Sequence, residues 1–247
     1  MKKSPLFLAG FFIIILITAC SPDDGRSDIR DFYFPLKSLT EGLVYEYQPV
    51  GTDTSAPVYW YYQSFLQPDS NFFTGTYYEQ DLIPLQLTRE EVVSNGMLLE
   101  DINLYLRDTF GQQTRIQGEI LSGSVFPFMV EENGGIFLYK VRFDFPNAEN
   151  YSTTVIKNRY YVGDTTYTLS GNTYPAVVFE VKELIEHGNE EAGYAEPELE
   201  GTEIYAKGIG LVYYDKGPKE GERIAYELQD RYPMADLKAK LRKMEGQ

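Results

Sequence analysis

The ten residues IFLYKVRFDF, positions 136–145, alternate between apolar and charged side chains along most of their length. One set of alternate positions holds Phe137, Tyr139, Val141, Phe143 and Phe145, and the other holds Lys140, Arg142 and Asp144. Successive side chains of a β-strand point to opposite faces of its sheet, so this period of two predicts a strand with one buried and one wet face. Such one-sided strands are typical of antiparallel sheets.

The same period recurs along the chain after residue 40. Apolar residues occupy alternate positions in three further segments: Ile102, Leu104 and Leu106; Val177, Phe179, Val181 and Ile185; and Ile224, Tyr226 and Leu228. Turns that contain glycine separate such runs, as at Asn95-Gly96, Gly163-Asp164 and Gly171-Asn172. No long alternation of strand and helix patterns is present, which argues against a doubly wound fold. We therefore expect an all-β, mainly antiparallel domain.

Pairs of adjacent aromatic residues indicate how this sheet is shaped. The pairs are Tyr61-Tyr62, Phe72-Phe73, Tyr77-Tyr78, Tyr160-Tyr161 and Tyr213-Tyr214. Each pair puts one ring on either face of a strand, so the sheet must cover or use its second face. A strongly curved sheet or an open barrel would do this. Gly208 and Gly210, two residues apart on one expected strand face, would permit a bend or a close approach there.

One or two short helices are expected beside the sheet. Thr88 and Glu91 have the spacing of a capping box before Val92. Near the C-terminus an apolar stripe lies opposite a basic face: Met234, Leu237, Leu241 and Met244 against Lys238, Arg242 and Lys243. The stripe predicts an amphipathic helix over residues 234–247 that docks on the sheet or frays in solvent. The alternative is a basic surface for anionic lipid or another envelope polymer.

Composition excludes several classes of function. The chain has 247 residues, with 37 acidic and 22 basic side chains and a net charge of -15, so the phosphates of a nucleic acid would be repelled. A single cysteine and a single histidine are too few for a structural zinc site or an intramolecular disulfide. We expect no metal, no cofactor and no nucleic-acid partner.

The N-terminal residues have the pattern of a targeting signal. Lys2 and Lys3 precede an apolar run over residues 6–17, which is too short to span a bilayer comfortably. The run ends in LITAC, residues 16–20, and this resembles the lipobox of bacterial lipoproteins. The resemblance implies cleavage between Ala19 and Cys20 and acylation of Cys20, so that acyl chains hold the protein to a membrane. It divides the chain into a lipoprotein signal peptide (1–19), a flexible polar tether (20–31), an antiparallel β domain (32–233) and the amphipathic C-terminal helix (234–247).

Two further segments resemble a group of uncharacterised outer-membrane lipoproteins of Bacteroidota. The first is FYFPL, residues 32–36, followed by Gly42, Tyr45 and Tyr47; the second is IYAKGIGLV, residues 204–212. Residues 43–45 replace a tryptophan region that the group usually has. The resemblance implies a lipid-anchored protein of the outer membrane, on its periplasmic face or on the cell surface. A curved antiparallel sheet is also similar, at the level of the fold, to the half-barrels of lipoprotein carriers.

The most aromatic stretch, VYWYYQSF at residues 58–65, is the expected ligand face. Period-two alternation puts Tyr59 and Tyr61 on one side and Trp60 and Tyr62 on the other. One side belongs to the core. The other either covers a helix or loop, or forms a platform for a sugar ring or an acyl chain.

No residues form a recognisable catalytic group. His187, the only histidine, is expected in a loop between strands, and no two carboxylates stand out as a glycosidase pair. The eight glutamates between Glu183 and Glu203 predict a solvated loop, with a weak calcium site as the alternative. We expect a non-catalytic envelope protein that binds an apolar or saccharide ligand. The alternatives are an accessory subunit that contacts an outer-membrane protein, and a carboxylate-based hydrolase.

Overall fold

A computed structural model describes residues 25–51, 55–131, 134–145 and 151–245 of the chain. The strands are β1 (Arg26–Asp28), β2 (Leu43–Pro49), β3 (Val58–Leu66), β4 (Asn71–Tyr78), β5 (Pro84–Val93), β6 (Gly96–Arg107), β7 (Gln113–Pro127), β8 (Met129–Glu131), β9 (Phe137–Asp144), β10 (Ser152–Leu169), β11 (Asn172–Asn189), β12 (Gly193–Ala195), β13 (Glu198–Ala206), β14 (Gly210–Gly217) and β15 (Ile224–Tyr232). The helices are the 3₁₀ turns η1 (Arg30–Phe32) and η2 (Leu36–Leu39) and the α-helix α1 (Met234–Glu245).

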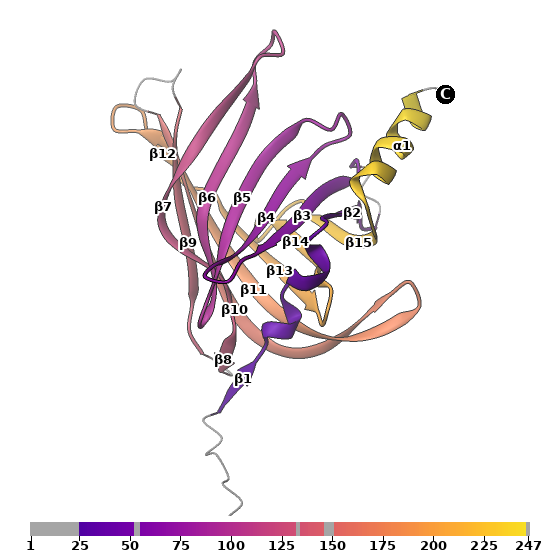
Figure 1. Ribbon diagram of the computed structural model, residues 1–247. Helices are drawn as coiled ribbons and strands as arrows, with labels where there is room; N and C mark the ends of the chain where they lie inside the picture. The colour runs from indigo at the N-terminus through magenta and orange to yellow at the C-terminus, as the bar shows by residue number, and fades with distance from the viewer. Residues whose placement is uncertain (1–24, 52–54, 132–133, 146–150, 246–247) are drawn as a thin grey trace, which may run out of the picture.

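The main sheet closes on itself. Its strand order is β10-β9-β7-β6-β5-β4-β3-β2-β15-β14-β13-β11, and β10 pairs with β11 to complete a barrel of 12 antiparallel strands (Figure 1). β12 extends the edge of β11, while β1 and β8 form a separate small ladder. The predicted all-β antiparallel fold is confirmed.

The alternating segment that predicted the fold is β9. Val141 and Phe143 are buried inside the barrel, whereas Arg142 and Asp144 point outward and form an ion pair at 2.9 Å. A barrel of this many strands is wider than an eight-stranded one, so large side chains are needed to fill it. Tyrosine and phenylalanine supply that volume.

Aromatic pairs place one ring on each side of the barrel wall, as expected. Tyr62 and Phe73 pack inside with stacked rings, their centroids 5.2 Å apart. Their neighbours Tyr61 and Phe72 lie outside, where the guanidinium of Arg89 covers the ring of Phe72 at 5.2 Å.

Residues 29–39, here called the plug, close one end of the barrel. Ile29, Tyr33, Phe34 and Leu39 are buried in the main core cluster. The ring of Phe34 stacks on Phe73 with centroids 4.9 Å apart. Ile29 N–H donates to the carbonyl of Phe128 at 2.9 Å, which ties the plug to the wall. Ordered structure therefore begins inside the expected tether, because β1 pairs with β8 and Ile29 is buried.

The sequence suggested that Gly208 and Gly210 share one strand face, but they do not. Gly208 lies in the turn between β13 and β14, and Gly210 begins β14. Gly210 has φ +101°, and a Cβ atom there would lie 2.5 Å from the ring of Phe34. The glycine is needed because the plug packs directly against this backbone.

Two local predictions are wrong. Thr88 and Glu91 do not begin a helix but lie in β5, opposite Gly75 and Phe72 of β4. Strand β5 pairs with β4 on one edge and with β6 on the other, and this pairing outweighs the local capping pattern. Gly163 does not form a turn between strands, since it lies at a bulge within β10.

Helix α1 lies outside the barrel, on β2 and β3 (Figure 1). Leu237 and Leu241 pack against Val44 and Tyr59, and Lys240 Nζ contacts both oxygens of Glu46 at 2.7 Å. The helix is thus docked on the sheet, with its basic residues exposed. Within the described ranges, no helix has both the length and the apolar character needed to cross a membrane.

Candidate binding site at the open end of the barrel

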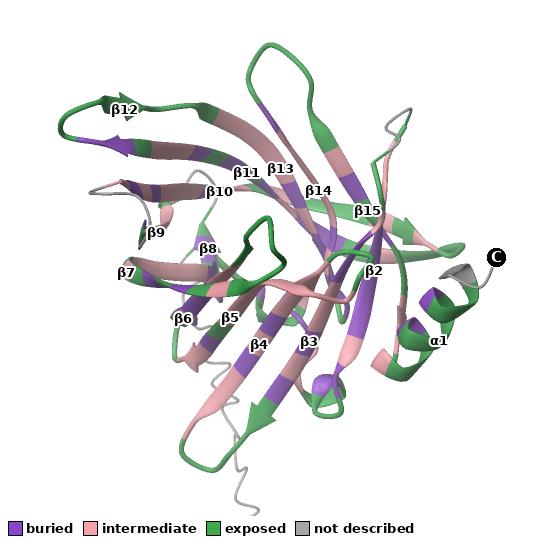
Figure 2. Ribbon diagram, turned by 90° about the horizontal axis from the view of Figure 1, so that it is seen from above, coloured by how far each residue is buried: buried purple, intermediate pink, exposed green. Residues whose placement is uncertain are grey.

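The barrel end opposite the plug is lined by apolar side chains that are only partly buried. Trp60, Tyr77 and Leu104 occupy inward-facing positions there, as the register from β3 through β6 shows, and all three are half-buried. Leu106 and Ile224, nearer the rim, are 44% and 47% exposed. Figure 2 looks down on this end, with intermediate and exposed segments around the rim. This end is therefore accessible to solvent, in contrast to the end that the plug fills.

Charged side chains lie on the inner wall below the rim. We call six of them the ionic floor: Glu90, Lys157, Arg159, Glu183, Glu203 and Lys216. They project from β5, β10, β11, β13 and β14. Antiparallel pairing sets Lys157 directly opposite Glu183, so the two side chains share the inward face.

The upper part of the floor is accessible from the open end. Lys157 Nζ lies 3.6 Å from Glu183 and 3.5 Å from Glu203, and Lys216 donates to Glu183. The side chains of Lys157 and Lys216 remain 24% and 38% exposed. A cavity of about 40 Å³ lies between these groups and Tyr214.

The lower part of the floor is buried against the plug. Arg159 donates from Nε and Nη2 to the two oxygens of Glu203, at 2.7 and 3.3 Å. Tyr205 donates its hydroxyl to Glu203 at 3.0 Å. The hydroxyl of Tyr33, in the plug, donates to the carboxyl of Glu90 at 2.5 Å. The plug and the charged wall thus meet in one buried polar layer.

Burial and neighbouring charges set the pKa values of the floor's carboxyl groups. Burial raises the pKa of Glu203, but Arg159 and Lys157 outweigh it and hold that pKa at about 2. Burial also raises the pKa of Glu183, but Lys157 and Lys216 outweigh it and hold that pKa below its usual value. Burial dominates at Glu90 and raises its pKa to about 7, against the opposing effects of Tyr33 and Arg159. Glu183 and Glu203 are therefore ionised at neutral pH, whereas the pKa of Glu90 lies close to neutral pH.

The expected ligand face at Tyr59, Trp60, Tyr61 and Tyr62 is divided between two environments. Tyr59 is buried beneath α1, and Tyr61 lies outside with its hydroxyl 3.5 Å from the carbonyl of Glu41. Trp60 and Tyr62 face inward and stack with centroids 5.7 Å apart. The outward pair thus covers a helix and a loop, while Trp60 contributes to the open end.

A hollow of about 410 Å³ lies at the rim beside this aromatic wall. It is lined by Ala56, Pro57, Val58, Tyr77, Glu79, Gln80, Asp81 and Tyr226. Its carboxyl group at Asp81 contacts Arg107 at 3.3 Å. Two tyrosine rings and several polar groups therefore share this lining.

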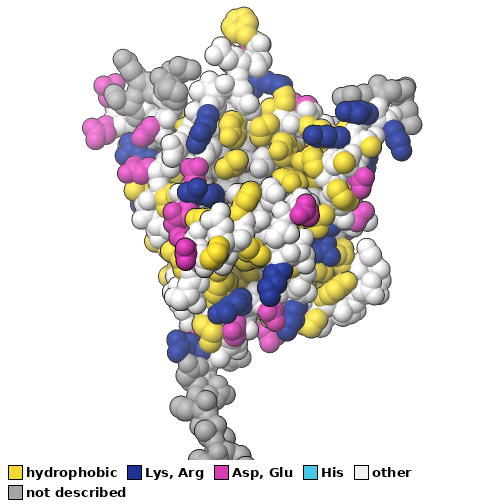
Figure 3. All heavy atoms as spheres, in the orientation of Figure 1, with side chains coloured by type: hydrophobic (Ala, Val, Ile, Leu, Met, Phe, Trp, Pro, Cys, Tyr) yellow, Lys and Arg dark blue, Asp and Glu magenta, His cyan; other side chains and the backbone are white. Residues whose placement is uncertain are grey.

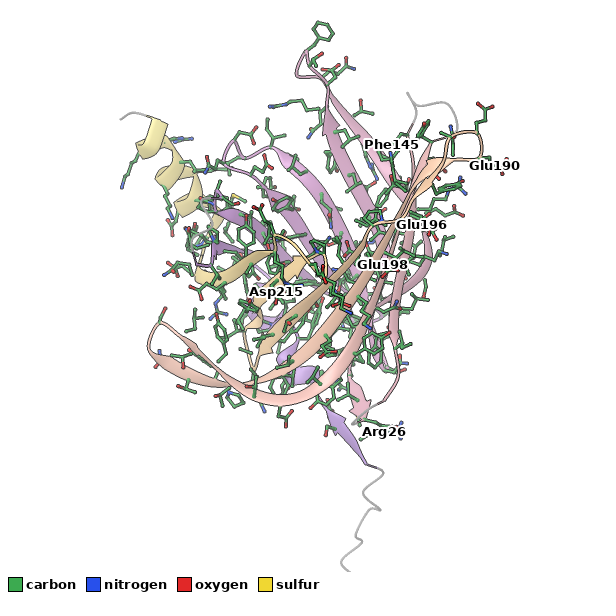
Figure 4. The ribbon with its side chains drawn as sticks, turned by 180° about the vertical axis from the view of Figure 1, so that it is seen from behind. Arg26, Phe145, Glu190, Glu196, Glu198 and Asp215 are labelled. Carbon is green, nitrogen blue, oxygen red and sulfur yellow. The ribbon has the colours of Figure 1, made fainter. Side chains whose placement is uncertain are left out.

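The segment from Glu183 to Glu203 does not form the solvated loop that was predicted. Glu183 and Glu203 are buried in strands, because Lys157, Arg159 and Lys216 neutralise them inside the barrel. Figure 4 shows Glu190, Glu196 and Glu198 toward the rim near β11 and β12. Across the described part of the chain, no group of three or more His, Cys, Asp or Glu side chains is arranged to hold a metal ion.

His187 lies in β11 and not in a loop. Its Nδ1 is 2.7 Å from the hydroxyl of Thr153, and its ring contacts those of Phe145 and Tyr151. The strand continues past the glutamates because β10 and β12 pair with both of its edges. No serine or cysteine nucleophile contacts this histidine among the hydrogen bonds of the described residues. Cys20 and Ala19, the expected lipidation and cleavage sites, lie outside those residues.

The ionic floor was missed at the sequence level, although a signal for it was present. Val177, Phe179, Val181 and Ile185 form an apolar face on alternate residues, and Glu183 occupies the missing position of that series. A charged residue on an otherwise apolar strand face indicates a buried ion pair or a wet interior.

Comparisons with known proteins give a limited result. No family model and no curated protein matches the sequence. Among solved structures, the chain is similar to a "putative lipoprotein" from Parabacteroides distasonis, with 13% identity and a TM-score of 0.48 over 80% of this chain and 95% of that one. It is similar, with the same identity and TM-score, to a "putative exported protein" with a YmcC-like fold from Bacteroides fragilis, over 81% and 98% of the two chains. These likenesses do not assign a family, a ligand or an activity, so the resemblance of residues 32–47 and 204–212 stays a prediction.

Proposed function

We propose that this chain is a lipid-anchored protein of the cell envelope, held at the outer membrane, whose barrel binds an amphipathic ligand without catalysing a reaction. The anchor rests on the lipobox that ends at Cys20. The binding role rests on one observation, the partly exposed apolar lining opposite the plug. An interior that is closed at one end and accessible at the other is suited to enclose an acyl chain.

The position of the plug supports an open end that is directed away from the anchor. Strand β1 lies at the plugged end, and the rim lies at the other end of the barrel (Figure 1). Acyl chains on Cys20 would hold the plugged end toward the membrane. A ligand would then enter from the side that faces away from that membrane.

Fluorescence of Trp60, the only tryptophan, tests this function directly. The mature chain, from residue 20 onward, with Cys20→Ser would be titrated with decanol, because this variant lacks both the apolar signal peptide and acyl groups of its own. We expect a saturable change in emission that weakens in Leu106→Gln, which alters the inner wall. Tyr105→Gln, a change on the outer face of the same strand, should leave binding unaltered. The absence of any saturable response to acyl-chain probes would overturn the proposal.

A saccharide is the second candidate ligand, and the hollow beside Tyr77 and Tyr226 favours it. Saccharide binding predicts a response of Trp60 to a glycan panel, because Trp60 packs against Tyr77 with ring centroids 5.3 Å apart. Tyr226→Leu should weaken that response and leave decanol binding intact. A panel without any responding glycan would remove this candidate.

A further inference from the structure

We infer that the ionic floor binds the oxyanion head group, a carboxylate or a phosphate, of an acyl-chain ligand whose chain lies along the apolar wall above it. The inference rests on the proposed function, since it names the chemical class of the ligand that enters the open end. Three observations carry it: an unpaired donor, a charge surplus and the order of the layers.

The unpaired donor is Nη1 of Arg159. Among the described residues this is the one buried side-chain nitrogen or oxygen that lacks a hydrogen-bond partner. The Arg159 side chain is 9% exposed, and Glu203 occupies only its Nε and Nη2. A buried guanidinium N–H without an acceptor is costly, so an acceptor that enters the barrel would be held strongly.

The charges of the floor favour an anion as that acceptor. Lys157, Arg159 and Lys216 carry three positive charges, while Glu183 and Glu203 carry two negative ones. The remaining carboxyl, Glu90, receives a hydrogen bond from Tyr33. The floor is neutral when Glu90 is ionised and has a surplus of one positive charge when Glu90 is protonated, and a single oxyanion bound beside the lysines would neutralise that surplus. This surplus lies inside a protein whose net charge is -15.

The order of the layers fits an amphipathic molecule with its head group inward. Lys157 lies two residues closer to the rim than Arg159, or about 7 Å along β10. Above Lys157 the inner wall becomes apolar, with Val155 next on β10 and Val141 opposite it on β9. An acyl chain that extends from the lysines toward the rim would contact Leu104 and Leu106. The head group would thus contact charged side chains, and the acyl chain would contact apolar ones.

Three probes with the same chain and different head groups test the inference: decanoate, decyl phosphate and decanol. Each would be titrated into the mature chain, from residue 20 onward, with Cys20→Ser, and Trp60 emission and calorimetry would be the readouts. We expect decanoate or decyl phosphate to bind about tenfold or more tightly than decanol, because a charged head group gains hydrogen bonds that the alcohol cannot match. Preference for decanoate indicates a fatty acid, and preference for decyl phosphate indicates a lipid phosphate.

Lysine variants show whether the floor is responsible. Lys157→Gln leaves Glu183 with Lys216 and Glu203 with Arg159, and Lys216→Gln leaves Glu183 with Lys157. Each should lower the affinity for the anionic probes several-fold while decanol binding is unchanged. Lys157→Arg should retain the preference. Lys182→Gln removes a positive charge from the outer face next to Glu183 and is the matched control.

The outcomes separate this inference from the proposed function. Equal affinity for decanol and the anions, or an equal loss in Lys182→Gln, would overturn the head-group inference and leave the binding function standing. Failure of all three probes would overturn both. Circular dichroism of each variant would show that it is folded.

Discussion

Among single residues, Glu90 makes the stability of the protein depend on pH. Its pKa is 4.5 in the unfolded reference and about 7 in the folded protein, because burial opposes its ionisation. Between these pH values the folded protein holds a proton that the unfolded chain has released. Stability contributed by this group is therefore lost as the pH rises from about 4.5 to about 7, and the penalty is complete above that range.

Glu90→Gln should remove this penalty. The amide oxygen of glutamine can still accept the hydrogen bond from Tyr33, and the side chain no longer ionises. We expect the variant to raise the free energy of unfolding at pH 8 by on the order of 1–3 kcal/mol, with little change at pH 5. Urea denaturation at both pH values measures the difference. Glu91→Gln, on the outer face, is the control, and a difference that does not vary with pH would contradict the prediction.

Glu203 has the opposite dependence. Arg159 and Lys157 lower its pKa to about 2, so its contribution to stability is present above pH 4.5 and is lost as the pH falls toward 2. Its partner is tightly buried, and removal of the carboxylate would leave Arg159 charged without a counterion. The buried pair therefore fixes the conformation of the wall against which the plug packs.

Among the secondary-structure elements, the plug packs inside the core, whereas helix α1 packs only on the outer face of the barrel. Phe34 contacts rings from three different strands, those of Tyr45, Tyr62 and Phe73. Helix α1 instead packs on the outer face through Leu237 and Leu241. Loss of the plug would expose the centre of the core, whereas loss of the helix would expose one patch of the wall.

Phe34→Ala should destabilise the protein by about 3–5 kcal/mol, because it removes a buried ring and leaves a cavity that the strands cannot fill. Thermal and urea unfolding would measure the loss. Phe65→Ala is the matched control, since Phe65 is 44% exposed, and its effect should be far smaller. Equal effects of the two substitutions would show that the plug does not stabilise the barrel.

Sequence periodicity predicted the strands well because it reports which face of a strand is buried. Val141 to Asp144 follow the expected alternation of buried and exposed residues. In β6 the alternation is not seen in burial, because Asn103 is as buried as Ile102 and Leu106 is exposed near the rim. Periodicity could not predict the plug, because residues 29–39 enter a space that exists only after distant strands have paired. For the same reason, Lys157 and Arg159 on β10 gave no sign of their partners on β11, β13 and β14.

In the molecule as a whole, the inside of the barrel and its outer surface differ in net charge. Lys157, Arg159 and Lys216 are directed inward together with the carboxyl groups of Glu90, Glu183 and Glu203, so the charges of the interior nearly cancel and the outer surface carries most of the net charge of -15. Apolar side chains also reach the surface, and Figure 3 shows them gathered over the upper part of the face that carries β4, β5 and β6. An acidic exterior would repel the phosphates of a nucleic acid, and the absence of such a partner stays a prediction.

Replacement of the expected acylation site tests the location of the protein. Cys20→Ser should move the chain from the membrane fraction to the soluble fraction of cells, because serine lacks the thiol that forms the thioether. Cell fractionation followed by immunoblotting measures this, and mass spectrometry of the wild-type protein should show a chain that begins at an acylated Cys20. Ser21→Ala, which leaves the cysteine in place, is the control. Membrane association that persists in Cys20→Ser would contradict the anchor.

The short ladder between β1 and β8 has a mechanical consequence for an anchored protein. Three residue pairs, from Arg26 and Glu131 to Asp28 and Met129, join the chain to the wall before it enters the barrel. With Cys20 acylated, as we propose, thermal movement of the bilayer would pull on the chain, and this tension would reach the ladder before it reached Phe34. The hydrogen bonds of the ladder would bear the load at the plugged end of the barrel, and the aromatic interior would be shielded from the pull.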